Sequence, residues 1–263
     1  MNRSIFITGT DTGVGKTMLT AALLMAYRYD GVDAVPFKPV QTGCEPDATG
    51  FLRAPDVDLC LRLAGLHDIG PNKYKELAPF RYPLACSPHL AAEQAGETID
   101  LNALLDSARR LASQHEVVLA EGAGGVCVPL NRQETMLDLM ARLGWPVLIA
   151  ARPGLGTLNH TALTVQAVRR HELPLLGIVV VHASPPSGDF IEADNLRTLP
   201  WLCDGPVLGE IPYAGQDENS MPIHAEAIRR AGQRILLALR NPSSGNPASS
   251  VTHTDEPQDQ WPI

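Results

Sequence analysis

The sequence predicts an α/β protein of a single domain, with a mostly parallel central sheet of about seven strands and helices on both faces. Short apolar runs alternate with helical segments along residues 5 to 239. The runs lack the apolar–polar alternation of a half-exposed strand, so both faces of each strand should be covered. Strand–helix alternation of this kind produces a parallel sheet between two layers of helices. At 263 residues and 44% hydrophobic, the chain can bury one large core.

The first element is a short apolar strand at residues 5–9 that leads through a glycine-rich turn into a helix. The turn reads Gly9-Thr-Asp-Thr-Gly-Val-Gly-Lys-Thr17, and we refer to it as the phosphate-binding loop. Gly13 and Gly15 let backbone N–H groups approach an anion, and the following helix adds the positive end of its dipole. The alternative is an ordinary strand–turn–helix corner.

Two side chains at the end of this loop extend the interpretation to a nucleotide. Lys16 can reach the terminal phosphates, and the Thr17 hydroxyl can hold Mg²⁺. The loop is a variant of the common pattern, because the strict form has glycine where Thr10 stands.

The remaining elements follow in order along the chain. Residues 16–29 predict a well-buried helix, and residues 34–37 predict a short strand that its prolines place near an edge. Residues 44–55 are expected to be loop, residues 56–65 a helix, and Ser87-Pro88 a helix start with serine as the cap. Further helices are expected near residues 100–114, 134–143, 158–171, 190–199 and 224–239, and strands at residues 116–120, 147–150, 176–181 and 207–211.

Composition narrows the range of partners. The formal charge of −8 offers no basic field for a polyanion, so nucleic acid is not expected and a bound nucleotide should be a small molecule. Five scattered cysteines favour a reduced, cytoplasmic setting. We expect a soluble protein, because we find neither a signal sequence nor an apolar run of membrane-spanning length.

Residues 1–240 are assigned to one domain, and residues 241–263 to a disordered tail that has almost nothing to bury.

Polar residues follow several of the expected strands, and the carboxyl ends of parallel strands meet at one edge of a sheet. Glu121 leaves a buried strand, where a carboxylate is costly without a cation. Mg²⁺ is the favoured partner, and a capping role or a pair with a lysine is the alternative. Lys38 also follows a strand, where it is either a fixed cation for a transferring phosphoryl group or a plain surface lysine.

Each of three other positions near these strand ends allows a functional and a structural interpretation. Thr42 donates to an anion or stabilises the turn at Gly43. The segment Pro153-Gly-Leu-Gly-Thr-Leu-Asn-His160 is a second anion nest at a helix start, suited to a carboxylate, or a glycine-rich turn capped by Thr157. His160 has no assignable carboxylate partner, which favours a packed or helix-surface histidine over a base.

Six segments in this order resemble the dethiobiotin synthetase family of the P-loop NTPase superfamily, which closes the ureido ring late in biotin synthesis. The resemblance runs from about residue 5 to residue 239. It rests on the phosphate-binding loop, Phe37-Lys-Pro-Val-Gln-Thr-Gly43, Ser87-Pro-His89, Glu121-Gly-Ala-Gly-Gly125, Gly154-Leu-Gly-Thr-Leu-Asn-His160 and Leu208-Gly-Glu-Ile-Pro212.

The resemblance implies a homodimeric, ATP-dependent ligase with Mg²⁺ as cofactor and diaminopelargonate, CO₂ and ATP as substrates. In that family one substrate amine traps CO₂ as a carbamate, and ATP phosphorylates the carbamate to a carbamic-phosphoric anhydride. The second amine then closes the ring with loss of phosphate. This chemistry needs positioning and charge stabilisation more than a nucleophilic side chain.

The resemblance also implies a role for each matching residue. The catalytic residues would be Lys38, Lys16 and Thr12, and the metal ligands would be Thr17, Asp56 and Glu121. The nucleotide would be bound by Gly13, Val14, Gly15, Lys16, Thr17, Met18, Asp56, Glu121, Gly122, Ala123, Gly124, Val181, His182, Ile211, Pro212 and Tyr213. The substrate would contact Thr42, Ser87, Gly124, Leu155, Gly156 and Asn159. In the family the substrate carboxylate is received from the neighbouring subunit, so dimerisation would complete the site.

Two positions leave questions within this family. Val181 stands where many members have an asparagine that reads adenine, so base selection should be loose. Asp58 beside Asp56 leaves the metal ligand ambiguous, although the register points to Asp56, and both aspartates also suit the first turn of a helix.

Two rival interpretations are weaker. A cobyric acid synthase or amidase-like relative should carry a glutamine-hydrolysing domain for which this chain is too short. A regulatory or partition-type P-loop ATPase switch usually has a lysine where Asp11 stands, and the acidic charge does not support DNA loading.

Overall fold

The computed structural model describes residues 3–67, 69–185, 190–215 and 224–241, and within them a six-stranded parallel sheet forms the centre of the molecule. Its strand order is β10-β9-β8-β1-β7-β2, and every pairing is parallel. The strands are β1 (Ile5–Gly9), β2 (Ala34–Phe37), β7 (Val117–Glu121), β8 (Val147–Ala151), β9 (Leu175–Val181) and β10 (Val207–Ile211). The predicted fold class is confirmed, with six strands in the described residues where about seven were expected.

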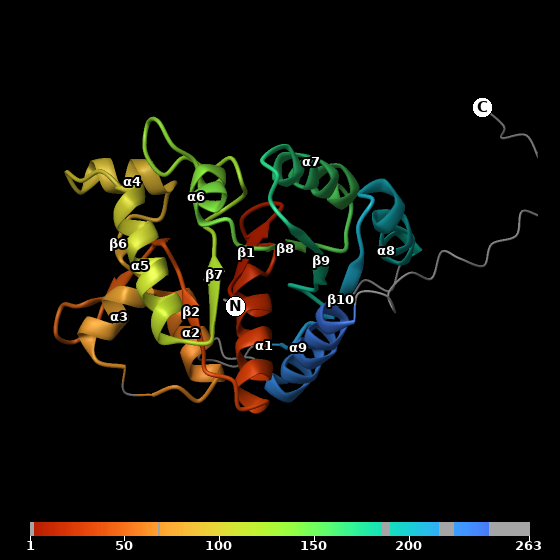
Figure 1. Cartoon of the computed structure of the whole chain (residues 1–263), viewed down its shortest axis with the longest axis horizontal. Helices are drawn as coiled ribbons and strands as arrows, with labels where there is room; N and C mark the ends of the chain where they lie inside the picture. The colour runs from red at the N-terminus through yellow and green to blue at the C-terminus, as the bar shows by residue number, and fades with distance from the viewer. Residues whose placement is uncertain (1–2, 68, 186–189, 216–223, 242–263) are drawn as a thin grey trace, which may run out of the picture.

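Helices cover both faces of this sheet (Figure 1). One face packs against α1 (Lys16–Tyr29) and α9 (Ala225–Arg240), which lie side by side. The other face packs against α5 (Leu101–Gln114), α6 (Met136–Leu143), α7 (Thr157–Arg170) and α8 (Phe190–Leu202). The sequence places the helices there because their apolar residues have no other surface to bury against.

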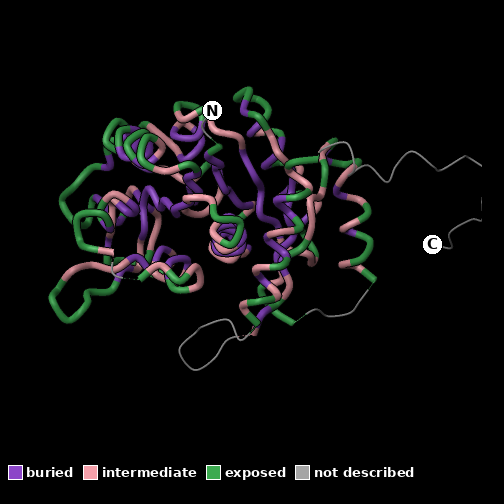
Figure 2. The backbone as a smooth tube through the Cα atoms, turned by 60° about the horizontal axis from the view of Figure 1, so that its bottom comes forward, coloured by how far each residue is buried: buried purple, intermediate pink, exposed green. Residues whose placement is uncertain are grey.

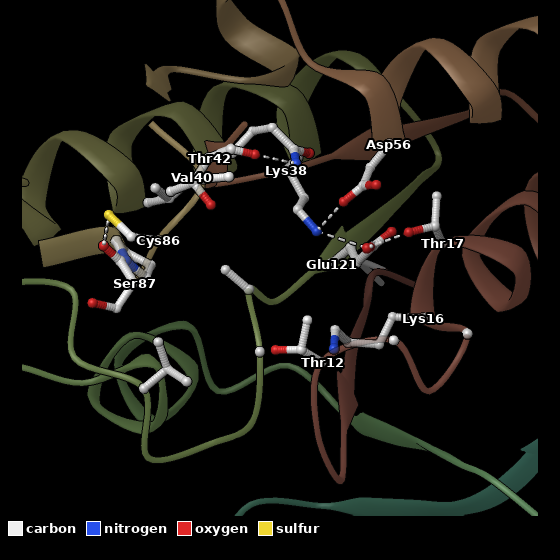
Figure 3. A pocket seen from close by; sticks show the side chains of 18 of the residues that line it. Thr12, Lys16, Thr17, Lys38, Val40, Thr42, Asp56, Cys86, Ser87 and Glu121 are labelled. Carbon is white, nitrogen blue, oxygen red and sulfur yellow. Dashed lines mark hydrogen bonds and ion pairs between the residues drawn. The ribbon is translucent and has the colours of Figure 1, made fainter. Parts of the chain in front are cut away.

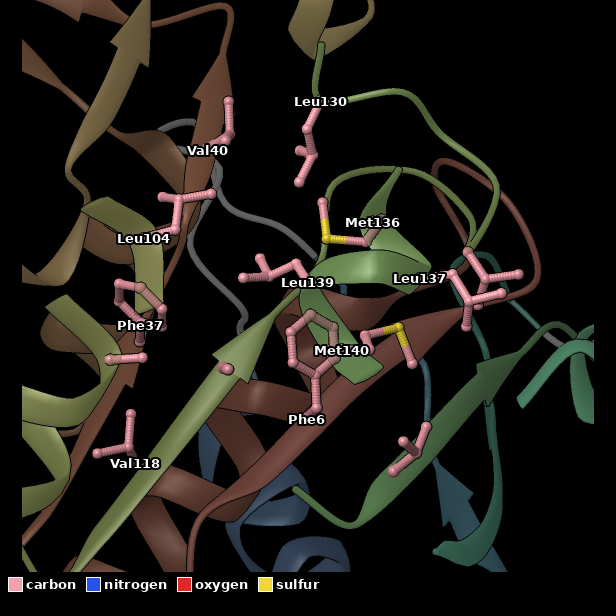
Figure 4. Close-up of a cluster of buried hydrophobic side chains, with 14 of the residues drawn as sticks. Phe6, Phe37, Val40, Leu104, Val118, Leu130, Met136, Leu137, Leu139 and Met140 are labelled. Atoms are coloured by element: carbon pink, nitrogen blue, oxygen red, sulfur yellow. The ribbon is translucent and has the colours of Figure 1, made fainter. Parts of the chain in front are cut away.

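Neighbouring residues of one strand contribute to different hydrophobic clusters. In β1, Ile5 and Ile7 belong to the cluster under α1 and α9, whereas Phe6 belongs to the cluster on the opposite face. Figure 4 shows Phe6 among the side chains of Leu139 and Met140 from α6. Full burial of each such side chain contributes about 1.5–3 kcal/mol. The strands β1, β7 and β8 are buried along their whole length (Figure 2). Because the core holds these strands in place, the positions of their carboxyl ends are fixed as well.

Prolines and capping residues agree with most of the predicted helix and strand limits. The edge position of β2, which contains Pro36, is confirmed. The helix α2 (Pro55–Leu63) begins with proline in its first turn. In α4 (Pro88–Gln94) Ser87 is the cap residue and Pro88 the first helical residue, as predicted, although the Ser87 side chain makes no capping hydrogen bond.

The chain between residues 40 and 82 holds more structure than the sequence predicts. Residues 44–55 are not all loop, because Asp47 accepts hydrogen bonds from the N–H groups of Thr49 and Phe51 and closes a short hairpin. Five elements in this stretch were not predicted, because four are strands of two or three residues and the fifth is a helix of seven residues. The elements are β4 (Glu45–Pro46), β5 (Leu52–Arg53), α3 (Pro71–Leu77) and the parallel pair β3 (Val40–Thr42) and β6 (Phe80–Tyr82).

Two expectations concern the chain as a whole. The predicted tail, residues 241–263, lies outside the described residues apart from Asn241. Within the described residues, every helix is too short or too polar to span a bilayer.

Candidate active site

A cavity of about 680 Å³ lies at the carboxyl ends of β1, β2 and β7. Four segments far apart in the sequence line it: the phosphate-binding loop, residues 38–42, residues 85–88 and residues 121–128, together with Asp56 (Figure 3). Adjacent parallel strands end at the same edge of the sheet, so their terminal side chains meet there. Residues 10–17, 38–43, 121–125, 152–159 and 211–212 were expected to share this edge, and the structure brings the first three of these segments into the cavity but not the last two.

The phosphate-binding loop has the backbone geometry of an anion nest. Gly15 adopts φ +91° immediately before α1 begins at Lys16. A β-carbon on Gly15 would lie 2.3 Å from Cγ1 of Val181, so the loop passes close against the end of β9. The nest therefore needs glycine at this position both for its dihedral angles and for its close packing.

Lys16 folds over this loop and is largely buried. Its Nζ donates a hydrogen bond to the carbonyl oxygen of Asp11 at 2.7 Å. Burial, with a further contribution from the charge of Lys38, lowers the pKa of Lys16 to about 8. The side chain thus lies on the cavity wall at the start of α1, where the helix dipole also favours an anion.

Lys38 is the centre of a buried ion cluster. Only 4% of the residue is exposed, and its Nζ lies 2.6 Å from Oδ2 of Asp56 and 2.7 Å from Oε1 of Glu121 (Figure 3). Burial opposes the charge of Lys38, but Glu121 and Asp56 together raise its pKa above the ordinary value. The alternative of a plain surface lysine is therefore wrong.

The carboxylates of Asp56 and Glu121 meet the Thr17 hydroxyl beside this lysine. Thr17 Oγ1 donates to Oε1 of Glu121 at 2.9 Å. Burial raises the pKa of Glu121, whereas for Asp56 the cost of burial is outweighed by Lys38, which lowers the pKa. Glu121 does pair with a lysine, as one interpretation of the sequence expected, and it also lines the cavity.

The structure separates the two aspartates of α2. Asp56 lines the cavity, whereas Asp58 pairs with Arg53 at 2.5 Å and accepts the hydroxyl of Tyr74 at 2.9 Å. Asp58 is therefore committed to a structural network, and the register that pointed to Asp56 agrees with the geometry.

The donor set at this end of the cavity fits a magnesium ion. Thr17, Asp56 and Glu121 offer oxygen ligands, and Mg²⁺ is usually held by one or two carboxylates together with water and phosphate oxygens. Within the described part of the chain, no group of three His, Cys, Asp or Glu side chains gathers into a full protein cage. An ion that also binds a nucleotide needs no such cage.

A second glycine turn, residues 154–156, leads into α7, and residues 154–159 lie outside the cavity lining. Gly156 adopts φ +90° and is the cap residue, so Thr157 is the first residue of the helix and the alternative of a Thr157 cap is wrong. Leu155 is 87% exposed, and Asn159 is also exposed. Of the predicted substrate residues, the structure thus brings Thr42, Ser87 and Gly124 together in the cavity but not Leu155, Gly156 and Asn159.

The ends of β9 and β10 lie on the opposite side of β1 from Lys38, as the strand order requires. Val181 is buried against Gly15, and His182 Nε2 lies 2.8 Å from Oε2 of Glu210. Pro212 and Tyr213 follow directly after β10, and 37% of Tyr213 is exposed. This group of predicted nucleotide residues is contiguous with the phosphate-binding loop but does not line the cavity.

The remaining predicted residues divide between the cavity and the core. Thr12, Gly13, Thr17, Met18, Ala123 and Gly124 line the cavity. Val14 is buried, Ile211 is part of the core under α1 and α9, and the Gly122 N–H donates to the carbonyl of Ile7 at 3.0 Å. Any contact of Val14 or Gly122 with a ligand would therefore involve the backbone.

Six residues that line the cavity were not among the predicted site residues: Val40, Gln41, Ala85, Cys86, Pro88 and Val128. Gln41 lies between the predicted Lys38 and Thr42, so its position in that segment was an available signal. Cys86 precedes Ser87 in the same way. Val128 lies in an apolar stretch without a motif, and only the folded loop brings it against Gly124.

Comparison with known proteins gives three consistent findings. The AAA domain family model matches residues 3–220. The chain is 46% identical over 198 residues to an ATP-dependent dethiobiotin synthetase BioD of Anaeromyxobacter sp. (strain Fw109-5), covering 74% of this chain and 85% of that protein. It is 43% identical over 240 residues to the protein of the same name from Anaeromyxobacter dehalogenans (strain 2CP-C), covering 90% and 89% of the two chains.

Solved structures agree on the fold. The septum site-determining protein MinD of Pyrococcus horikoshii OT3, complexed with Mg-ADP, superimposes with a TM-score of 0.57 at 16% identity, covering 92% of this chain and 98% of that chain. At this identity the likeness concerns the arrangement of strands and helices alone.

Proposed function

The chain belongs to the AAA domain family and, within it, to the ATP-dependent dethiobiotin synthetases, and we propose that it joins diaminopelargonate and CO₂ into dethiobiotin. It is a ligase of biotin biosynthesis.

The observation that carries the proposal is the position of Lys38. A buried ammonium group, held by two carboxylates at 2.6 and 2.7 Å, lines the same cavity as a loop suited to a triphosphate. Charge fixed in advance at the place where a phosphoryl group is transferred lowers the barrier without later reorganisation. Surface lysines have no such fixed geometry.

The proposed reaction has three steps, in which this chain supplies positions and charges. One amine of the substrate attacks CO₂ and loses a proton, which gives a carbamate. A carbamate oxygen then attacks the γ-phosphorus of ATP, the bond to the β-phosphate oxygen breaks, and ADP leaves. The second amine attacks the carbonyl carbon of the resulting anhydride and loses a proton, which closes the ring and expels phosphate.

Named residues have separate tasks in these steps. Lys16 and the N–H groups of the phosphate-binding loop hold the triphosphate, and Thr12 contacts phosphate and carbamate. Lys38 stabilises the negative charge that the carbamate oxygen and the transferring phosphoryl group share. In-line geometry and this charge stabilisation are what phosphoryl transfer requires from a protein.

Thr17, Asp56 and Glu121 would hold Mg²⁺, which when bound supplies charge neutralisation at the phosphates. Lys38 contacts the same two carboxylates, so its ion pairs keep the ligand set together. Thr42, Ser87 and Gly124 face the part of the cavity left for the diamine.

We further propose that two copies of the chain form the complete site in the cytoplasm. The second glycine turn lies outside the cavity of its own subunit and projects Leu155 into solvent. A homodimer would bury that side chain and bring the backbone N–H groups of the turn to the substrate carboxylate of the other subunit. Residues 1–240 form the catalytic domain in this proposal, with metabolites and not nucleic acid as partners.

The decisive test is phosphate release with diaminopelargonate, bicarbonate and MgATP. We expect release that depends on the diamine and matches the dethiobiotin formed, one for one. A protein that hydrolyses ATP at the same rate with and without the diamine would contradict the proposal.

A further inference from the structure

The carboxylate of Glu121 is held by three side chains, one of which lies outside the cavity lining. Its Oε1 accepts hydrogen bonds from Thr17 at 2.9 Å and from Lys38 at 2.7 Å. Its Oε2 accepts a hydrogen bond from the hydroxyl of Thr20 at 3.0 Å. Among the described residues, Thr20 is the one side chain found within hydrogen-bonding distance of Oε2.

Thr20 is placed to act on Glu121 and not on a ligand. It lies three residues after Thr17 on α1, so both hydroxyls project from the same face of the helix. The residue is fully buried and does not line the 680 Å³ cavity. It therefore touches neither the nucleotide nor the diamine in the proposed complex.

The single proton of the Thr20 hydroxyl has two possible acceptors. Besides Glu121, the carbonyl oxygen of Lys16 lies 2.9 Å away. That carbonyl already accepts the backbone N–H one turn along the helix, whereas Glu121 Oε2 has no other donor among the described residues. A hydrogen bond to an ionised carboxylate is also about twice as strong as one to a neutral carbonyl. The proton is therefore directed to Glu121.

We propose that Thr20 is a positioning residue that fixes Oε2 of Glu121 and thereby keeps Oε1 turned toward Thr17 and Lys38. The inference rests on the proposed function, because it takes Glu121 as a ligand of the Mg²⁺ that accompanies ATP. Removing the hydroxyl would leave a buried carboxylate oxygen without a donor, and the carboxylate would rotate to find one.

The test compares Thr20→Val, which keeps the shape and removes the hydroxyl, with Thr20→Ser, which keeps the hydroxyl. A non-hydrolysable ATP analogue is titrated into each protein by calorimetry, once with MgCl₂ and once with EDTA. In MgCl₂, Thr20→Val should bind about 10- to 100-fold more weakly than wild type, the usual effect of losing a residue that orients a metal ligand. In EDTA the two should bind alike, and Thr20→Ser should follow wild type in both buffers.

Thr164→Val is the matched control. Thr164 is also a buried helical threonine whose hydroxyl bonds to the carbonyl four residues earlier, at 2.8 Å from His160, but among the described contacts it has no carboxylate acceptor. The Thr164→Val substitution should lower the melting temperature without changing the ratio of the affinities for the ATP analogue in MgCl₂ and in EDTA.

Two results would overturn the role of Thr20: equal weakening with and without magnesium, or a Thr20→Ser protein as weak as Thr20→Val. These binding data need no diamine. A wild-type protein without diamine-dependent phosphate release would thus refute the proposed function, while the magnesium dependence would still decide the role of Thr20.

Discussion

The phosphate-binding loop and the second glycine turn end in left-handed cap glycines of similar φ but have very different surroundings. Each ends in a glycine cap, Gly15 with φ +91° or Gly156 with φ +90°, and each begins a helix of 14 residues without a side-chain cap. The first is surrounded by buried charged groups of its own chain. The second carries Leu155, which is 87% exposed.

This difference shows that a glycine-capped helix start supplies N–H donors, while the neighbouring residues decide what the donors are used for. In the first loop, Lys16 and Lys38 place positive charge beside the donors. In the second, an exposed apolar side chain offers a contact surface for another copy of the chain. An ion pair between Arg152 and Asp11, at 3.3 Å, links the two turns.

The largest expected effect comes from removing the charge that distinguishes the first loop. Lys38→Ala should lower kcat by about 10²–10³-fold, the range found when one charge-stabilising donor is removed from a transition state. The affinity for an ATP analogue should fall much less, because the lysine acts mainly during transfer. Steady-state kinetics and calorimetry measure the two quantities.

The exposed Lys73 on α3 provides the control, and Lys73→Ala should leave both quantities unchanged. Equal losses of turnover and affinity in Lys38→Ala would contradict the assigned role.

The next effect concerns stability and compares the two caps directly. Gly156→Ala should lower the free energy of unfolding by about 1–2 kcal/mol, because alanine is strained at positive φ. Gly15→Ala should cost about 1–3 kcal/mol more, because its β-carbon would lie 2.3 Å from Val181, whereas the nearest atom to one on Gly156 is 3.8 Å away. Urea unfolding at one protein concentration measures both. Equal losses would mean that Val181 moves aside at little cost.

A smaller effect is expected from the surface of the second turn. Leu155→Ser should weaken self-association by at least about tenfold, because burial of a leucine side chain contributes about 1.5–3 kcal/mol. Sedimentation across a concentration series measures this, and activity should fall with dilution in parallel. Leu237→Ser, at a 59% exposed leucine of α9, is the control. A dimer as stable as wild type in Leu155→Ser would place the interface elsewhere.

The smallest effect concerns the base of the nucleotide. Val181 supports the first loop by packing, and its apolar side chain offers no hydrogen bond to a base. One neutral hydrogen bond is worth about 0.5–1.5 kcal/mol, so kcat/KM for GTP or CTP should lie within about tenfold of that for ATP. A preference for ATP greater than about 100-fold would show that another group reads the base.

The sequence predicted those elements well whose capping residues and pattern of apolar residues indicate the same limits. The helix expected at residues 16–29 has those limits in the structure, because a glycine cap begins it and Asp30-Gly31 ends it. The pairing of Val40 with Phe80 was not predicted. Strands of three residues joined across a long loop carry no periodic pattern to detect.

The site, like the fold, was predictable where a regular pattern determines the position of a residue, and not where tertiary contacts decide it. Strand ends of a parallel sheet converge, which was enough to bring Lys38 and Glu121 to one edge. The choice between Asp56 and Asp58 required tertiary contacts, because Arg53 and Tyr74 bind the second aspartate. Thr20 gave no signal without the position of Glu121, since a threonine inside an apolar helix usually bonds its own backbone.

The central place of β1 has a consequence for biosynthesis. Residues 5–9 are made before their sheet partners, which are residues of β7 and β8 as far along the chain as Ala150. As the ribosome delivers the chain from its amino end, the phosphate-binding loop does not have a strand on each side of β1 until residue 150 has been synthesised. The sheet on both sides of the loop is therefore complete only after β8 has emerged, and contacts of such long sequence separation make that folding step slow.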